Sequence, residues 1–174
     1  VLTPRSKSHF SPEQLAVMGP PPDPAYSKKE AGARRAELVT HLLPPLLAAC
    51  EAHCARLAGS AHGASVLYEA VHAASEEGAE GVSDATKSAA QRVMTTLAEA
   101  ALQKPPPPSK ESGEKTYDVE LVAHPFGARL LKRLAQQYEA FASGLAGCLS
   151  GKLLKSSKAG GGWVVLALLE AKGT

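Results

Sequence analysis

The side chains in this sequence that are best suited to bind a ligand are cations on one face of a predicted helix. In the stretch HPFGARLLKRLAQQ (124–137), Arg129, Lys132 and Arg133 fall on one side at about 100° per residue, with Gln136 beside them. Such a face can pair with nucleic-acid phosphates, although a basic run on a helix is commonly only a solvated surface. The apolar side chains fall roughly opposite: Phe126, Leu130, Leu131, Leu134 and Phe141.

Two further groups of basic residues lie toward the ends of the chain. The net charge is +3 over residues 1–35, −6 over residues 36–128 and +5 over residues 129–174, within a total of +2. A polyanion is therefore attracted to the ends and repelled by the middle. The three groups together provide ten cations as candidate phosphate contacts. The two further groups are Lys28, Lys29, Arg34 and Arg35, and Lys152, Lys155 and Lys158.

Other residues that could bind a metal or take part in catalysis lack the partners that such a site needs. Cys50, His53 and Cys54 are close in sequence, but no second ligand pair follows at zinc spacing, so the two thiols are expected in the core. His124 precedes Pro125 and has no nucleophile or carboxylate at a motif spacing, so we expect it to cap or orient a turn. We therefore expect no enzyme activity, no metal and no other cofactor.

The composition favours helices that pack closely. Hydrophobic residues make up 44% of the 174 residues and aromatic residues only 5%, so that Ala, Leu and Val supply most of the apolar content. The apolar runs are much shorter than the roughly 20 residues that cross a bilayer, which predicts no membrane span. The N-terminus has neither an initiator Met nor a signal-peptide pattern, so we expect a fragment of a longer protein.

Pro and Gly divide the chain into short predicted helices. Pro44 and Pro45 are expected to break one helix and to start the next, because proline lacks an amide donor. Before this break, Leu38 and Leu42 are expected to share one face. Residues 103–117, rich in Pro, Ser, Lys and Glu, predict a flexible insertion. The predicted helices span residues 11–19, 27–43, 46–59, 63–75, 82–102, 124–137, 141–149 and 163–171.

Three segments share a glycine-anchored pattern that is typical of a helical repeat. Gly63, Gly127 and Gly162 each precede two adjacent aliphatic residues at the third and fourth positions after the glycine. Glycine permits close approach to a neighbour, and the aliphatic pairs are expected to bury between stacked helices. For Trp163, which follows the third glycine, the alternatives are stacking on a base and filling the gap between repeats, and core packing is the favoured one. The aliphatic pairs are Val66 and Leu67, Leu130 and Leu131, and Val165 and Leu166.

The segment HPFGARLLKRL (124–134) resembles the second helix of a pumilio (Puf) repeat. Three stretches in order are similar to the C-terminal CPL region of the Puf-A/Penguin class of pumilio-like proteins. The resemblance implies that residues 1–174 form an all-α fold, a curved or right-angled α-solenoid of atypical Puf-like repeats. The stretches are SKKEAGARRAELVTHLLPPLL (27–47), VELVAHPFGARLLKRL (119–134) and AGGGWVVLALLE (159–170).

The same resemblance implies a role in the nucleolus and nucleus. Members of this class act in large ribosomal subunit biogenesis, including rRNA processing, and some act in translation regulation. The implied partners are RNA (pre-rRNA or mRNA), DNA as a further nucleic acid, and pre-ribosomal proteins, with a monomeric chain and no membrane. Nucleic acid would be bound through basic surfaces with little sequence preference.

The residues at the base-reading positions of a Puf repeat agree with weak sequence preference. Alanine has no side-chain group that hydrogen-bonds a base, and lysine is a point charge rather than a planar fork. We therefore expect no base-by-base code. The rival hypothesis is a protein-interaction scaffold whose basic groups serve only solubility. By resemblance the reading positions hold Ala64, Ser65 and Tyr68, then Ala128, Arg129 and Lys132, then Trp163, Val164 and Ala167.

Overall fold

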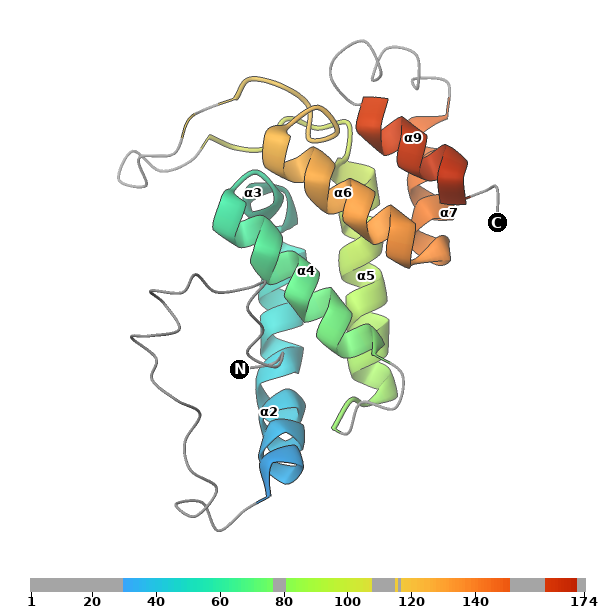
Figure 1. The fold of residues 1–174 in the computed structure, drawn as a ribbon. Coiled ribbons are helices and arrows are strands. Elements are labelled where there is room, and N and C mark those ends of the chain that lie inside the picture. Colours follow the sequence, from blue (N-terminus) through green and yellow to red (C-terminus); the bar gives the residue numbers. More distant parts are fainter. Residues whose placement is uncertain (1–29, 77–80, 108–114, 116, 151–161, 172–174) are drawn as a thin grey trace, which may run out of the picture.

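The computed structural model describes residues 30–76, 81–107, 115, 117–150 and 162–171. Every regular element in these ranges is a helix, which confirms the predicted all-α class (Figure 1). None of the described helices is long and apolar enough to span a membrane. The predicted helix at 11–19 lies outside the described residues. The helices are α2 (Ala31–Ala52), α3 (Cys54–Ala58), α4 (Ala61–Ser75), α5 (Asp84–Ala100), α6 (Pro125–Gln137), α7 (Glu139–Leu149) and α9 (Gly162–Ala171).

The helices pack in two layers. Helices α2, α5 and α7 lie side by side in one layer, and α4, α6 and α9 form the other, in which they run in the same direction (Figure 1). The layers contact each other through α2 with α4, α4 with α5, α6 with α7, and α7 with α9. The short helix α3 connects the layers and packs on α4 and α5. The chain therefore passes from the first layer to the second three times, in agreement with three repeated units.

A continuous apolar core lies between the two layers. It is built from aliphatic stripes on the inner faces of the helices, because each helix turns its apolar side toward the opposite layer. Its largest fully buried side chains are Leu43 and Leu47 of α2, Leu67 of α4, Leu97 of α5, Leu121 before α6, Leu131 and Leu134 of α6, and Phe141, Leu145 and Leu149 of α7.

Helix α2 continues through Pro44 and Pro45, so the predicted break at these residues is wrong. Each proline removes the amide that would bond the carbonyl four residues earlier, on Thr40 or His41. All four residues are exposed, so water can reach these carbonyls. The opposite face of α2 is buried from Val39 to Cys50, on both sides of the prolines, and this packing offsets their cost. The buried face contains Val39, Leu43, Leu47 and Cys50.

The inner face of α2 is also shifted by one residue from the predicted face. Leu38 is 38% exposed and Leu42 is 49% exposed, whereas Val39 and Leu43 are 3% and 0% exposed. The predicted helix ended before Pro44, so the apolar residues after the prolines were not used to decide which face of the helix is buried. In the continuous helix those residues extend the stripe of Val39 and Leu43.

Two of the repeat glycines are needed for close contact with the chain before their helices. A Cβ on Gly63 would lie 2.4 Å from the Leu57 carbonyl oxygen, and a Cβ on Gly127 would lie 2.5 Å from the Leu121 carbonyl oxygen. In each case the contacted residue is six positions earlier. The equivalent contacts support the interpretation that α4 and α6 begin corresponding units.

The same two helices have side-chain caps at their N-termini. The Ser60 hydroxyl accepts a hydrogen bond from the Gly63 amide at 3.0 Å. The His124 ring nitrogen Nδ1 accepts one from the Phe126 amide at 3.3 Å. The prediction that His124 caps or orients its turn is confirmed.

The predicted burial of the aliphatic pairs holds fully only in α6, where Leu130 and Leu131 are both buried. Val66 in α4 is 41% exposed, and Leu166 in α9 is 43% exposed. The difference in burial follows from where each helix lies within its layer. Helix α6 has α4 on one side and α9 on the other, whereas α4 and α9 each have a described neighbour on one side only.

The ends of the predicted insertion at 103–117 are held together. The Leu121 amide donates to the Gln103 carbonyl, and the Val122 amide donates to the Ala101 carbonyl, both at 2.9 Å. Lys104 Nζ lies 2.8 Å from an Asp118 carboxylate oxygen at the same place. The segment that begins after α5 therefore returns to its starting point directly before α6.

Candidate nucleic-acid interface

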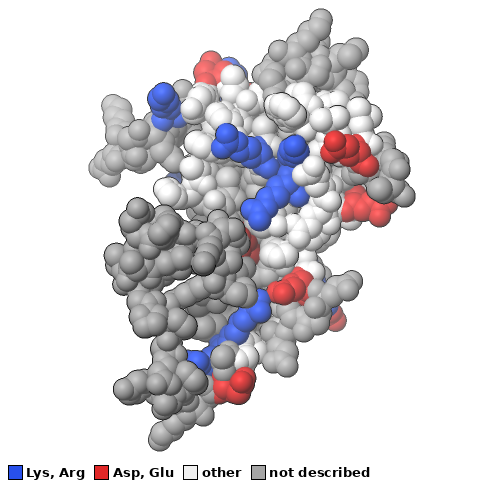
Figure 2. All heavy atoms as spheres, in the orientation of Figure 1, with Lys and Arg blue, Asp and Glu red and all other residues white. Residues whose placement is uncertain are grey.

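The three cations of α6 lie on its outer face, as the amphipathic pattern predicts. Arg129 and Arg133 are exposed and Lys132 is half-buried, while the inner face of the helix packs in the core. Figure 2 shows a compact group of Lys and Arg side chains over α6, with uncharged surface around much of it. We call Arg129, Lys132 and Arg133 the α6 cluster.

Arg133 is held by an aromatic ring from the neighbouring helix. Its guanidinium carbon lies 3.4 Å from the centre of the Tyr68 ring on α4. The Tyr68 ring is buried, and its hydroxyl donates a hydrogen bond to the Gln137 side-chain oxygen. A cation–π contact of this kind orients the guanidinium without neutralising it. The packing of α4 on α6 thus fixes one cation of the cluster.

A small polar network supports Tyr68. The Tyr68 ring is stacked on His72, with ring centroids 5.7 Å apart. The His72 nitrogen Nδ1 lies 3.2 Å from the Tyr138 hydroxyl and 3.3 Å from the Gln137 side-chain nitrogen. Because an amide nitrogen only donates, Nδ1 of His72 is the acceptor in the contact with Gln137. Burial, with a smaller effect of Tyr68, raises the pKa of the Tyr138 phenol, which remains uncharged.

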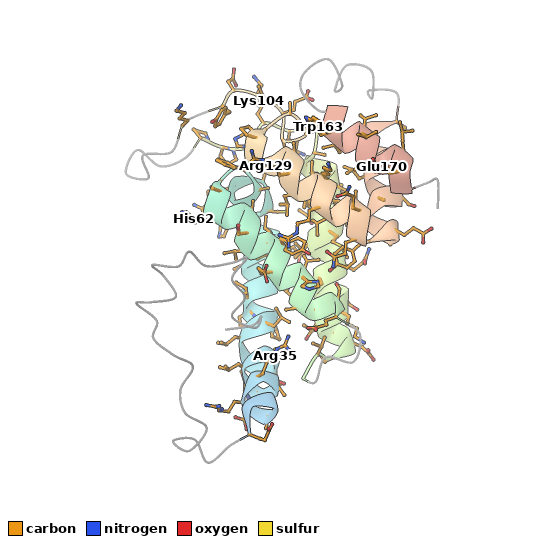
Figure 3. All side chains as sticks on the ribbon, viewed as in Figure 1. Arg35, His62, Lys104, Arg129, Trp163 and Glu170 are labelled. Atoms are coloured by element: carbon orange, nitrogen blue, oxygen red, sulfur yellow. The ribbon has the colours of Figure 1, made fainter. Side chains whose placement is uncertain are left out.

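Lys132 is held in a corresponding way on the other side of α6. Its Nζ lies 5.3 Å from the centre of the Trp163 ring on α9. Figure 3 shows Trp163 beside α6, near the beginning of α9. The α6 cluster is therefore flanked by one aromatic ring from each neighbour in its layer.

The expectation that Trp163 fills the core is wrong, since its side chain is 66% exposed. Helix α9 buries Val164, Ala167 and Leu168 against α6 and α7. Trp163 precedes this stripe by one position, which turns the ring away from the core. Local pattern alone did not show which of two adjacent apolar residues begins the buried stripe.

A groove of about 310 Å³ lies between α4 and α6. Its walls include the side chains of Ser65 and Tyr68 from α4 and of Phe126, Arg129 and Arg133 from α6. Two of the three α6 cations therefore face a concave surface with an aromatic wall. Such a surface combines charge for phosphates with apolar area for a base or a sugar.

The other predicted cations do not join the α6 cluster within the described part of the chain. Arg35 pairs with Glu76 at 2.9 Å, and Arg34 beside it is half-buried. Arg35 lies on the lower part of α2, well away from Arg129 (Figure 3). The remaining predicted cations lie outside the described residues, namely Lys28, Lys29, Lys152, Lys155 and Lys158.

The positions of the base-reading residues do not form complete sets. In α9, Val164 and Ala167 are fully buried, and only Trp163 of that set is exposed. In α4, the Tyr68 ring is covered by Arg133.

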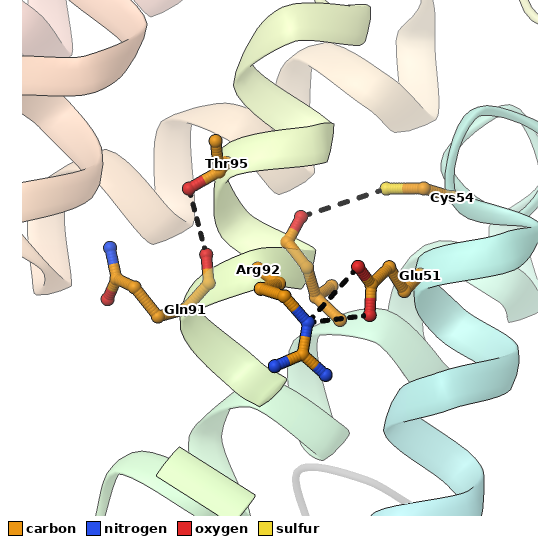
Figure 4. A network of polar contacts seen from close by, with 6 residues as sticks. Glu51, Cys54, Gln91, Arg92 and Thr95 are labelled. Carbon is orange, nitrogen blue, oxygen red and sulfur yellow. Dashed lines mark hydrogen bonds and ion pairs between the residues drawn. The ribbon is translucent and has the colours of Figure 1, made fainter. Parts of the chain in front are cut away.

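Cys50 and Cys54 are core residues, as predicted, with exposures of 1% and 2%. Burial, with smaller effects of the neighbouring Cys50 and Glu51, raises the pKa of the Cys54 thiol to about 12. The thiol faces the Val93 carbonyl at 4.0 Å, beside an ion pair of 3.2 Å between Arg92 and Glu51 (Figure 4). No group of three His, Cys, Asp or Glu residues among the described positions is arranged to hold a metal ion.

Together, the described helices form a two-layer helical scaffold with a basic patch on the outer face of α6. Residues 1–143 match the family model of the CPL (NUC119) domain, and the chain belongs to this family. The match ends within α7, so that it includes the α6 cluster but not Trp163. No curated protein and no solved structure matches the chain.

Proposed function

We propose that this chain is an RNA-binding module that grips the phosphate backbone with the α6 cluster and has no enzyme activity. The observation that carries the proposal is the arrangement of Arg129, Lys132 and Arg133 on one outer face, with two of them held by aromatic rings. Side chains that are held before binding lose less conformational entropy when they meet a ligand. Their charges remain available for phosphates.

The proposal extends to the repeat type and the setting of the protein. Membership in the CPL family, the repeated glycine contacts and the two layers support atypical pumilio-like repeats of the Puf-A/Penguin class. We propose that such a chain acts in the nucleolus as a monomer, on pre-rRNA during large-subunit biogenesis, together with pre-ribosomal proteins. Binding of mRNA in translation regulation, and of DNA, would use the same backbone contacts.

A salt series with matched variants tests the proposal. Each phosphate contact that is lost reduces the slope of log affinity against log salt by about one. The triple variant Arg129→Gln, Lys132→Gln, Arg133→Gln is expected to lower RNA affinity and to flatten this slope by about two to three. The control is Arg56→Gln, Lys87→Gln, Arg92→Gln, which removes the same charge from exposed positions of α3 and α5.

Equal slopes for the two triple variants would show that the α6 cluster does not contact phosphates.

The second candidate function, a protein-interaction scaffold, is favoured by the exposed side chains of Leu166 and Leu169 on α9. It predicts that RNA affinity is weak in the parent chain and changes little in either variant. Circular dichroism of both variants checks that the helices are retained.

A further inference from the structure

We infer that Trp163 and Lys132 form a stacking platform for one unpaired nucleobase, so that the α6 cluster takes single-stranded nucleic acid in preference to a duplex. This inference rests on the proposed function, because it adds a base contact to the same phosphate-binding surface. It goes beyond that function by naming the form of nucleic acid and a residue that distinguishes it.

The first reason is that Trp163 does not contribute its ring to the core. The side chain is 66% exposed, although α9 has a buried stripe formed by Val164, Ala167 and Leu168. An indole ring is the largest apolar side chain, and exposing most of it forgoes the gain of burial unless a ligand covers it. The packing of α9 therefore does not explain why a tryptophan stands at this position.

The second reason is the cation beside the ring. Lys132 Nζ lies 5.3 Å from the centre of the Trp163 ring, and most of the Trp163 side chain remains exposed beside this contact. Lys132 also places positive charge where the phosphate of a nucleotide would lie if its base stacked on the indole. Aromatic side chains next to a cationic surface are the usual means by which proteins hold unpaired bases.

The third reason is the position of the other two cations. Arg133 follows Lys132 directly, and Arg129 lies one helical turn before Arg133 on the same outer face. A strand with one base on Trp163 can therefore place its neighbouring phosphates along α6. A duplex cannot use the ring in this way, because its bases are already stacked on each other and it exposes mainly its backbone to a protein surface.

The chain contains a single tryptophan, so its fluorescence reports the environment of Trp163 alone. We expect single-stranded oligoadenylate RNA to quench this fluorescence as it binds. An abasic ribose-phosphate oligomer of the same length, and an RNA duplex with the same number of phosphates, are expected to bind through the cations without comparable quenching. Binding of oligoadenylate without quenching would overturn the inference.

Two substitutions on α9 give the matched affinity test. Trp163→Ala is expected to weaken oligoadenylate binding about tenfold while leaving duplex affinity and its salt slope unchanged, and Trp163→Phe is expected to restore most of the loss. The control is Leu169→Ala, at an apolar position of the same helix with the same 66% exposure, and it is expected to change neither affinity. Equal losses for Trp163→Ala and Leu169→Ala would also overturn the inference.

The design separates this inference from the proposed function. If oligoadenylate and duplex bind with steep salt dependence but Trp163→Ala has no effect, the stacking platform is wrong and the backbone contacts stand. If neither RNA binds the parent chain, both proposals are wrong.

Discussion

The guanidinium carbon of Arg133, on the outer face of α6, lies 3.4 Å from the centre of the buried Tyr68 ring of α4. The same ring stacks on His72, and its hydroxyl donates to Gln137 at the end of α6. Tyr68 thus packs one layer of the fold and at the same time orients a cation of the proposed interface. These two roles can be separated by substitution.

Tyr68→Phe keeps the ring and removes one hydrogen bond, so we expect the free energy of unfolding to fall by about 1 kcal/mol. Tyr68→Ala also removes a buried ring between α4 and α6 and is expected to cost about 3–5 kcal/mol. Urea denaturation followed by circular dichroism measures both. RNA affinity should be unchanged in Tyr68→Phe, because Arg133 keeps its ring. Similar costs for the two variants would show that the ring does not contribute to packing.

Two glycines in neighbouring helices should respond to alanine with opposite signs. A Cβ on Gly127 would lie 2.5 Å from both the carbonyl oxygen and a methyl group of Leu121, so Gly127→Ala is expected to destabilise by about 1–3 kcal/mol. Gly144 is exposed within α7, and a Cβ there meets nothing within 4 Å. Gly144→Ala should stabilise by up to about 1 kcal/mol, because alanine is the better helix former. Thermal unfolding of both variants decides the matter, and an unaffected Gly127→Ala variant would contradict the close contact.

The three cysteines should divide into one reactive and two protected thiols. Cys148 is exposed, whereas Cys50 and Cys54 are buried. Burial raises the pKa of Cys54 from its ordinary value of 9.0 to about 12, so the reactive thiolate is scarce in the folded chain. A colorimetric thiol reagent at mildly alkaline pH should modify one cysteine in the folded protein and all three in denaturant. Rapid modification of all three without denaturant would contradict the described core.

The same pKa shift has a consequence for stability. Below the ordinary pKa the Cys54 thiol is protonated in both the folded and the unfolded chain, so its contribution does not depend on pH. Above it, the thiol ionises in the unfolded chain and remains protonated in the folded chain. The free energy of unfolding should therefore fall as pH rises from 9.0 toward about 12.

The sequence is sufficient to predict α6 because one helix contains all the necessary information. The spacing of Leu130, Leu131 and Leu134 defines its inner face, and His124 with Pro125 defines its start. The cations then fall on the outer face by the period of the helix alone. The same reasoning fails for the exposure of Trp163, because exposure depends on how α9 is rotated against α6 and α7.

The aromatic partners of the α6 cluster could not be predicted for a related reason. Tyr68 and Trp163 are far from α6 in sequence and reach it only because α4, α6 and α9 share one layer. A local pattern shows which face of a helix is polar but not which side chain of another helix lies over it. The signal that was present is the single tryptophan in a chain with few aromatic residues.

The continuity of α2 through Pro44 and Pro45 leads to a last prediction, in which packing and local propensity are measured against each other. Proline in a helix interior costs about 3 kcal/mol relative to alanine, although part is offset because proline also restricts the unfolded chain. Both prolines are exposed, so their replacement removes no core contact and restores amide donors for two carbonyls. We expect Pro44→Ala, Pro45→Ala to raise the free energy of unfolding by about 2 kcal/mol or more. Leu43→Ala, directly beside them on the buried face, should lower it by about 2–5 kcal/mol. If the variant with both prolines replaced by alanine were less stable than the parent chain, packing of the inner face would not by itself hold α2 together.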